Sequence, residues 1–341
     1  MISGGGSGGI TPGFIDAPFD ALKRQARIDR TYLAWDFVSQ EPQVNGASDV
    51  CIVFVNEQAS EGWDRPNLAD PWSDRLILNI AGQCNNTQVI IHNAGIRLVD
   101  RWIDHPNITA VIFAHLPGQE TGQALTDVLY GKQSPSGRLP YTVAKSEADY
   151  GRLLHPIVPE NTTSPWYPQD NFTEGVYIDY KDFMARNVTP RFEFGFGLTY
   201  SNFEYADLTT SIASDVRAGL AGHTYNGGET APQPEGGDPA LWMMAATVTC
   251  TVKNIGHVSA AEVAQLYLHI PGGPSRVLRG FQKKLLQPGD KELVTFNLTR
   301  RDLSSWNVDA QQWMLQDGPY EVFVGKSVLD QQLYGRFKVS S

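Results

Sequence analysis

The sequence of 341 residues predicts an α/β domain followed by an all-β domain. Between residues 50 and 130, short apolar runs alternate with longer amphipathic segments, which is typical of a parallel sheet covered on both faces by helices. Beyond residue 201, apolar and polar residues alternate with a period of two, and Gly, Pro and Asp separate the runs. The predicted architecture is therefore a mostly parallel α/β sandwich and then a β-sandwich.

The first expected element is a helix over residues 16–26, with Asp16 as its N-cap and Pro18 in its first turn. The apolar or amphipathic runs of the α/β domain then follow over residues 50–55, 72–81, 89–92, 98–103, 110–114 and 121–130. We place the boundaries of this domain at residues 1–144.

A connector is predicted over residues 145–200, where the periodicity is lost and Pro, Asn, Tyr and Asp are abundant. Because the aromatic residues of so long a segment need burial, we expect it to be packed rather than free. Four of these aromatics are predicted to pack the connector onto the α/β domain, with a sugar-binding rim as the alternative: Trp166, Tyr167, Phe172 and Tyr177.

The all-β domain is predicted over residues 201–341. Its clearest alternating runs lie at 247–253, 262–270, 291–298 and 320–324. Residues 226–239 are dense in Gly, Pro and Glu and predict a mobile loop.

The net charge and the motif content of the sequence exclude several classes of partner and cofactor. The net charge of -10 disfavours nucleic acid and anionic membrane surfaces, so a neutral or cationic ligand is expected. No apolar run approaches the roughly 20 residues that span a bilayer. The sequence has no zinc-ligand spacing, phosphate-binding loop or Ser-His-Asp order, and we therefore expect no metal and no cofactor.

Six Asn-x-Ser/Thr acceptors predict glycosylation and hence a secreted, extracellular protein: Asn85, Asn107, Asn161, Asn171, Asn187 and Asn297. Met1 is not followed by a signal peptide, so the true amino terminus is expected upstream. In an oxidising compartment Cys51 and Cys84 could pair and leave Cys250 as a buried thiol, whereas three free thiols are the alternative.

Four stretches, in this order, resemble secreted fungal β-glucosidases of glycoside hydrolase family 3. They are Phe54-Val-Asn-Glu-Gln-Ala-Ser-Glu-Gly-Trp-Asp-Arg-Pro-Asn-Leu, Val111-Ile-Phe-Ala-His-Leu-Pro-Gly-Gln-Glu-Thr-Gly, Ser134-Pro-Ser-Gly-Arg-Leu-Pro-Tyr-Thr and Thr189-Pro-Arg-Phe-Glu-Phe-Gly-Phe-Gly-Leu-Thr-Tyr. The resemblance implies an amino-terminal barrel with a nucleophilic Asp, an α/β sandwich with an acid/base Glu, and a fibronectin type III-like domain.

Compared with the family layout, this chain is expected to begin inside the second domain. Its Gly4-Gly-Gly-Ser-Gly-Gly-Ile-Thr-Pro start resembles a loop inside the second domain, and no Ser-Asp-Trp-type segment carries the nucleophile. The resemblance therefore implies that the barrel, which would pack on the α/β domain, and the first strand of the sheet are absent.

Retaining glycosidases need two carboxyl groups about 5 to 5.5 Å apart. Glu61, in Ser60-Glu61-Gly62-Trp63, is the predicted acid/base because it follows a strand and matches the family's Glu-Gly-aromatic segment. We expect it to be partly buried against an aromatic side chain that raises its pKa. Glu57 is the second choice.

Three neighbours of Glu61 are weaker candidates for substrate binding. Trp63 offers an indole face for a sugar ring, or simply packs the loop. Asp64 and Arg65 are expected to pair or to tether the loop, with substrate contact as the alternative.

The resemblance implies hydrolysis of terminal β-D-glucosyl residues, as in cellobiose and cello-oligosaccharides, by the complete enzyme. The isolated chain is expected to be nearly inert. A β-xylosidase or another family 3 glycosidase is one alternative, and a non-catalytic carbohydrate-binding or interaction module is another.

Overall fold

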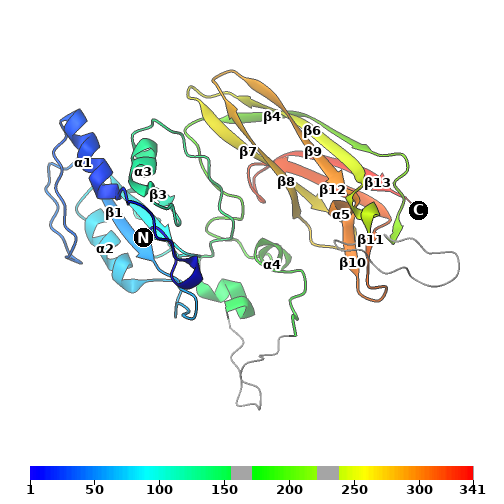
Figure 1. Cartoon of the computed structure of the whole chain (residues 1–341), viewed down its shortest axis with the longest axis horizontal. Coiled ribbons are helices and arrows are strands. Elements are labelled where there is room, and N and C mark those ends of the chain that lie inside the picture. The colour runs from blue at the N-terminus through cyan, green and yellow to red at the C-terminus, as the bar shows by residue number, and fades with distance from the viewer. Residues whose placement is uncertain (155–170, 221–237, 341) are drawn as a thin grey trace, which may run out of the picture. The chain divides into compact units, whose positions relative to one another are not determined.

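The computed structural model describes residues 1–154, 171–220 and 238–340 (Figure 1). They divide into two compact units. The first comprises Met1–Gln133 and Val143–His155, and the second comprises Ser134–Thr142 and Pro156–Ser341. Within the described ranges, no helix has the length and apolar character needed to cross a membrane.

A parallel sheet forms the centre of the first unit. Its order is β1-β2-β3, with β1 at Cys51–Glu57, β2 at Thr87–Asn93 and β3 at Ile108–Phe113. β2 is the central strand, and Val89, Ile90 and Ile91 in it have no exposed surface. This explains its continuously apolar sequence, because a strand covered on both faces has no polar side to present.

Helices cover both faces of this sheet. α2 (Pro71–Ala81) lies on one face, and α1 (Pro18–Asp29) and α3 (Thr121–Leu129) lie together on the other (Figure 1). Two short 3₁₀ turns, Gly6–Gly8 and Glu147–Leu154, complete the unit. The α/β sandwich predicted from the sequence is confirmed.

Two details of this unit differ from the prediction. The N-cap of α1 is Ala17, without a side-chain cap, because the Asp16 carboxylate binds the Arg24 guanidinium at 2.7 Å instead. The apolar run 98–103 forms turns and no regular element. Its apolar residues reflect burial, since Val99 and Trp102 are at most 1% exposed.

The second unit is built from antiparallel strands in three sheets. The four-stranded sheet has the order β13-β12-β7-β8, and the other two are β4-β6-β9 and β10-β11-β5. The strands are β4 Phe203–Ile212, β5 Gly219–Leu220, β6 Met244–Asn254, β7 Ala260–His269, β8 Val277–Leu286, β9 Lys291–Thr299, β10 Ser304–Asn307, β11 Gln312–Leu315, β12 Gly318–Gly325 and β13 Gln331–Val339. The short helices are α4 Tyr180–Ala185, η3 Pro239–Trp242 and α5 Arg300–Leu303.

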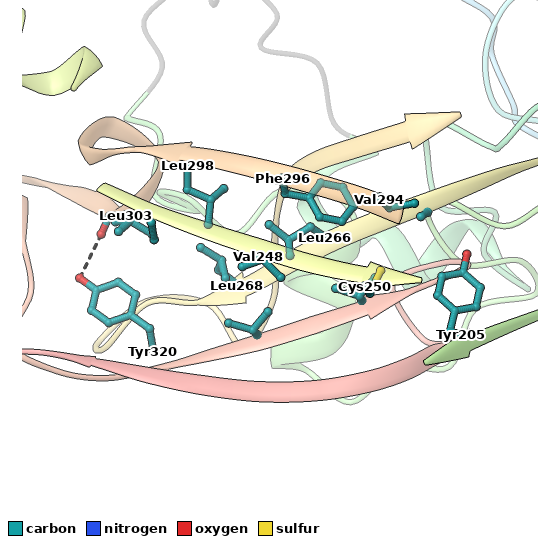
Figure 2. Packing of buried hydrophobic residues seen from close by; sticks show 14 of the residues in the cluster. Tyr205, Val248, Cys250, Leu266, Leu268, Val294, Phe296, Leu298, Leu303 and Tyr320 are labelled. Carbon is teal, nitrogen blue, oxygen red and sulfur yellow. Dashed lines mark hydrogen bonds between the residues drawn. The ribbon is translucent and has the colours of Figure 1, made fainter. Parts of the chain in front are cut away.

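Side chains from the two larger sheets form one core (Figure 2). Val248 and Cys250 of β6 pack there with Leu266 and Leu268 of β7, all without exposed surface. The Tyr320 hydroxyl donates to the Leu303 carbonyl at 3.0 Å, which satisfies a polar group inside the core. Period-two burial on facing sheets is the β-sandwich that the alternation predicted.

Residues 145–154 of the connector belong to the first unit, and residues 171–200 pack within the second. The ring of Tyr180 lies 4.5 Å from that of Phe194 and 6.2 Å from that of Tyr267 on β7. Phe172 and Tyr177 are 69% and 37% exposed, and their packing onto the α/β domain stays a prediction. Trp166 and Tyr167, like most of the predicted loop 226–239, lie outside the described residues.

Candidate active site

A tight turn follows the carboxyl end of β1 and carries Glu61 at its tip. The Trp63 amide donates to the Ser60 carbonyl at 3.2 Å, which closes a four-residue turn over Glu61 and Gly62. Gly62 has φ +75°, a value typical of the third residue of a type II turn, which glycine adopts without strain. The Glu-Gly pair in the sequence is thus explained by the backbone of the turn.

The glycine-rich amino terminus runs against this turn. The Gly5 amide donates to the Ala59 carbonyl at 3.0 Å, and the Ser7 amide donates to Glu61 Oε2 at 2.8 Å. A Cβ atom at Gly6 would lie 2.4 Å from the Glu61 Cβ, closer than two carbons can approach. The glycines are therefore needed for close contact with the turn, which the sequence did not reveal by itself.

The electrostatic surroundings of Glu61 differ from the expectation. Its side chain is exposed, and the hydrogen bond from the Ser7 amide holds the pKa of its carboxyl below the usual value. We expected partial burial and a raised pKa. That expectation is wrong for the described residues, because a backbone N–H stabilises the charged form and solvent reaches the side chain.

Glu57, the second candidate, lies inside the domain. It is 8% exposed, and its carboxylate meets Arg65 at 3.2 Å and Arg97 at 2.5 Å. Burial raises the pKa of the Glu57 carboxyl, and the two guanidinium groups oppose that rise. A carboxylate bound on both oxygens by arginines is poorly placed to meet a substrate.

The remaining predicted site residues are in the same loop. Trp63 is 52% exposed, so much of its indole surface is available for contact. Asp64 is exposed, whereas Arg65 is largely covered and ties the loop to Glu57 and to the Ile96 carbonyl. The partner of Arg65 is thus Glu57 rather than the adjacent Asp64.

The predicted covalent sites are distributed over both units. Cys51 and Cys84 form a disulfide, and Cys250 is a buried free thiol. The Asn107 side-chain amide is half-buried and donates to the Ala81 carbonyl at 2.8 Å. Asn161 lies outside the described residues, and the other predicted acceptors are exposed: Asn85, Asn171, Asn187 and Asn297.

The described parts of the chain contain no group of three His, Cys, Asp or Glu side chains that could hold a metal ion. What they bring together is one exposed carboxylate and one exposed indole on a braced turn. An exposed carboxyl group can exchange protons with a ligand, and an exposed indole can stack on the face of one.

The fold and the site define a two-domain class of protein, in which an α/β domain with a carboxylate-bearing turn precedes a fibronectin type III-like sandwich. Residues 1–200 match the glycosyl hydrolase family 3 C-terminal domain, and residues 262–328 match the fibronectin type III-like domain. The chain belongs to glycosyl hydrolase family 3.

Similar proteins extend over the whole chain. A probable β-glucosidase M of Aspergillus niger is 52% identical over 98% of this chain and 43% of its own length. The β-glucosidase cel3A of Pyricularia oryzae is 48% identical over 99% of this chain and 42% of its own length. The chain thus spans less than half the length of these curated relatives.

Solved structures give the same result. The β-D-glucoside glucohydrolase from Trichoderma reesei superimposes with a TM-score of 0.85 at 36% identity. The β-glucosidase D2-BGL from Chaetomella raphigera superimposes with a TM-score of 0.86 at 37% identity. Each match covers 99% of this chain and 47% of the solved chain.

Proposed function

We propose that this chain is the acid/base half of a retaining β-glucosidase and that Glu61 is the acid/base. The observation that carries the proposal is the position of Glu61, exposed at the tip of a braced turn after β1. In a retaining mechanism, such a carboxyl group protonates the departing oxygen and then activates water. The nucleophilic carboxylate belongs to a barrel domain outside this chain.

An acid catalyst needs a raised pKa, and we propose that Glu61 acquires one only when the nucleophile domain and a substrate complete the site. Its carboxyl is held in the charged form here by the Ser7 amide. A second carboxylate about 5 Å away and exclusion of water by a barrel and a sugar would both raise the pKa. We propose that assembly of the two halves raises the pKa of Glu61, so that its carboxylate takes up a proton from solvent before the substrate is cleaved.

The proposed substrate is a terminal β-D-glucosyl residue, as in cellobiose and cello-oligosaccharides. The relatives named above are called β-glucosidases, which favours glucosides over xylosides. We propose that Trp63 stacks on the leaving-group sugar, because its indole is half exposed beside Glu61. Asp64 is exposed next to it and could extend the contact through hydrogen bonds.

The protein is proposed to be extracellular. Four of the predicted glycan acceptors are exposed, and a disulfide joins Cys51 to Cys84. Disulfides persist in oxidising compartments, and N-glycans are added in the secretory pathway. We expect glycans at the exposed sites and none at Asn107, whose amide is engaged by Ala81.

The test joins the chain to the amino-terminal part of the Aspergillus niger relative and compares two substrates. The leaving group of cellobiose is a sugar hydroxyl, which must be protonated by an acid as it departs. The leaving group of 2,4-dinitrophenyl β-D-glucoside is a stable phenolate, which departs without protonation. The first chemical step determines kcat/KM for both. In the joined enzyme, Glu61→Gln should lower kcat/KM for cellobiose by about 10²–10⁴-fold and that for the dinitrophenyl glucoside by less than about tenfold.

The bare chain and two variants complete the design. The bare chain should hydrolyse neither substrate, and Glu41→Gln, an exposed glutamate of the same unit, should match the unmodified joined enzyme. Equal activity of Glu61→Gln and the unmodified enzyme on cellobiose would refute the assignment and favour Glu57. Activity of the bare chain would show that the nucleophile lies within it.

A further inference from the structure

The turn that carries Glu61 is closed at its base by an ion pair between two side chains that flank it. Glu57 is the last residue of β1, and Arg65 follows eight residues later. Arg65 Nη1 lies 3.2 Å from Glu57 Oε2, and Arg65 Nη2 donates to the Ile96 carbonyl at 2.6 Å. One guanidinium therefore fixes both ends of the loop to each other and to the segment after β2.

Glu57 is itself immobilised from its other side. Arg97 Nε lies 2.5 Å from Glu57 Oε1, and Arg97 Nη2 lies 2.6 Å from Asp74 Oδ1 in the first turn of α2. The Trp102 indole N–H donates to the same Asp74 oxygen at 2.9 Å. Arg97 has no exposed surface, so this chain of contacts lies inside the domain and salt screens it much less than a surface ion pair.

The loop has few other contacts to restrain it. The side chains of Glu61, Trp63 and Asp64 are exposed, and Gly62 has no side chain to bury. Backbone contacts with Gly5 and Ser7 restrain one side only. Segments with so few buried contacts open at low free energy, and a displacement of about 1 Å can cost an enzyme about 100-fold in rate.

We propose that Arg65, held by the buried Glu57, is the positioning residue for the acid/base turn. This inference rests on the proposed role of Glu61. Arg65 acts through the loop and does not contact the substrate. Glu57 then has a structural role, which explains why two glutamates four residues apart have opposite surroundings.

The first test measures order in the loop without any enzyme assay. Arg65→Gln and the unmodified chain are compared by amide hydrogen exchange, and Arg75→Gln, which breaks an exposed ion pair with Glu41 in the same unit, is the control. Exchange over residues 58–64 should become at least about tenfold faster in Arg65→Gln only, while exchange over β2 stays unchanged. Unchanged exchange over residues 58–64 would overturn the proposal.

The second test uses the joined enzyme and the two substrates. A misplaced acid should lower kcat/KM for cellobiose at least about tenfold more than that for 2,4-dinitrophenyl glucoside, whereas a loss of folded protein lowers both equally. An equal loss, or no loss, would overturn the proposal. Where Arg65→Gln does not fold, Arg65→Lys replaces it, because one ammonium keeps the charge but cannot reach both partners.

Glu61→Gln is measured in parallel to separate the two proposals. If this variant shows no dependence on the leaving group, the proposed function of Glu61 fails. The hydrogen-exchange result then still reports whether Arg65 orders the turn.

Discussion

Glu57 and Glu61 show how strongly position determines the chemistry of a side chain. Burial raises the pKa of Glu57, while the Ser7 amide lowers that of Glu61. Glu57 is enclosed by arginines and Glu61 faces solvent. Only the carboxylate of Glu61 is open to a molecule that arrives from solvent, whereas the buried carboxylate of Glu57 braces the fold.

A buried histidine predicts how stability depends on pH. His92 on β2 is 3% exposed, its Nε2 lies 3.2 Å from the Thr121 hydroxyl, and burial lowers its pKa to about 4. Between pH 6.5 and 4 the unfolded chain binds a proton here that the folded chain does not. The free energy of unfolding should therefore fall as the pH drops through this window, by up to about 3 kcal/mol.

Urea unfolding of the chain at pH 7 and pH 4.5 measures this contribution. His92→Gln, which keeps a hydrogen-bonding group near Thr121, should show a fall smaller by about 2 kcal/mol. His257→Gln, at an exposed position, should retain the full fall. An identical pH dependence in His92→Gln and the unmodified chain would contradict the prediction.

At the scale of elements, the first turn of α3 contacts the backbone just before α1 at a distance that only glycine permits. The Gly122 amide donates to the Asp16 carbonyl at 2.7 Å. A Cβ atom at Gly122 would lie 2.5 Å from the Ala17 carbonyl oxygen and 2.6 Å from that of Asp16. Because these are backbone atoms, the clash with an added Cβ can be removed only by moving α3 away from the segment before α1.

Gly122→Ala should therefore lower the free energy of unfolding by about 1–3 kcal/mol, as overpacking does. Gly82→Ala at the end of α2 is the matched control, since its added Cβ would lie 3.4 Å from the Leu78 carbonyl oxygen. Chemical unfolding of both variants gives the comparison. Equal stability of the two would show that α1 adjusts without cost.

Sequence periodicity predicted some elements and missed others. β6 and β9 alternate clearly and were predicted, whereas β4, β8 and β13 were not singled out. β8 has a single buried residue, Leu286, and so presents little apolar signal. In β4 and β13, partly buried positions hold polar or small residues such as Thr210 and Gly335. β7 is buried on nearly every residue because Tyr180 and Gly195 of the connector contact its outer face.

At the scale of the molecule, the two units differ in their covalent reinforcement. The disulfide between Cys51 and Cys84 spans 33 residues inside the first unit, and the second unit has only the free Cys250. A crosslink of this span contributes about 4 kcal/mol by restricting the unfolded chain. Its loss should lower the Tm of the first unit by several degrees.

Differential scanning calorimetry with and without a reducing agent tests this prediction. Two transitions are expected, and only one should shift on reduction. Cys51→Ala with Cys84→Ala should reproduce the shifted transition without reductant, while Cys250→Ala should leave the first-unit transition in place. A single transition that shifts as a whole would contradict independent unfolding of the units.

The sequence by itself determined the class and order of the domains, the family, and the turn that carries Glu61. Apolar periodicity reports which faces are buried, and the Glu-Gly-Trp segment after an apolar run is a local signal. Neither signal depends on distant residues. The candidate turn was therefore predicted at the right place after β1.

Only the tertiary structure decided the surroundings of the site. Arg97 meets Glu57 from 40 residues away in sequence and also pairs with Asp74, and the Ser7 amide reaches Glu61 across 54 residues. A pKa depends on these distant contacts and on burial, which no local pattern contains. For this reason the sequence placed Glu61 in a loop after β1, as the structure does, but predicted the wrong direction for the pKa of its carboxyl.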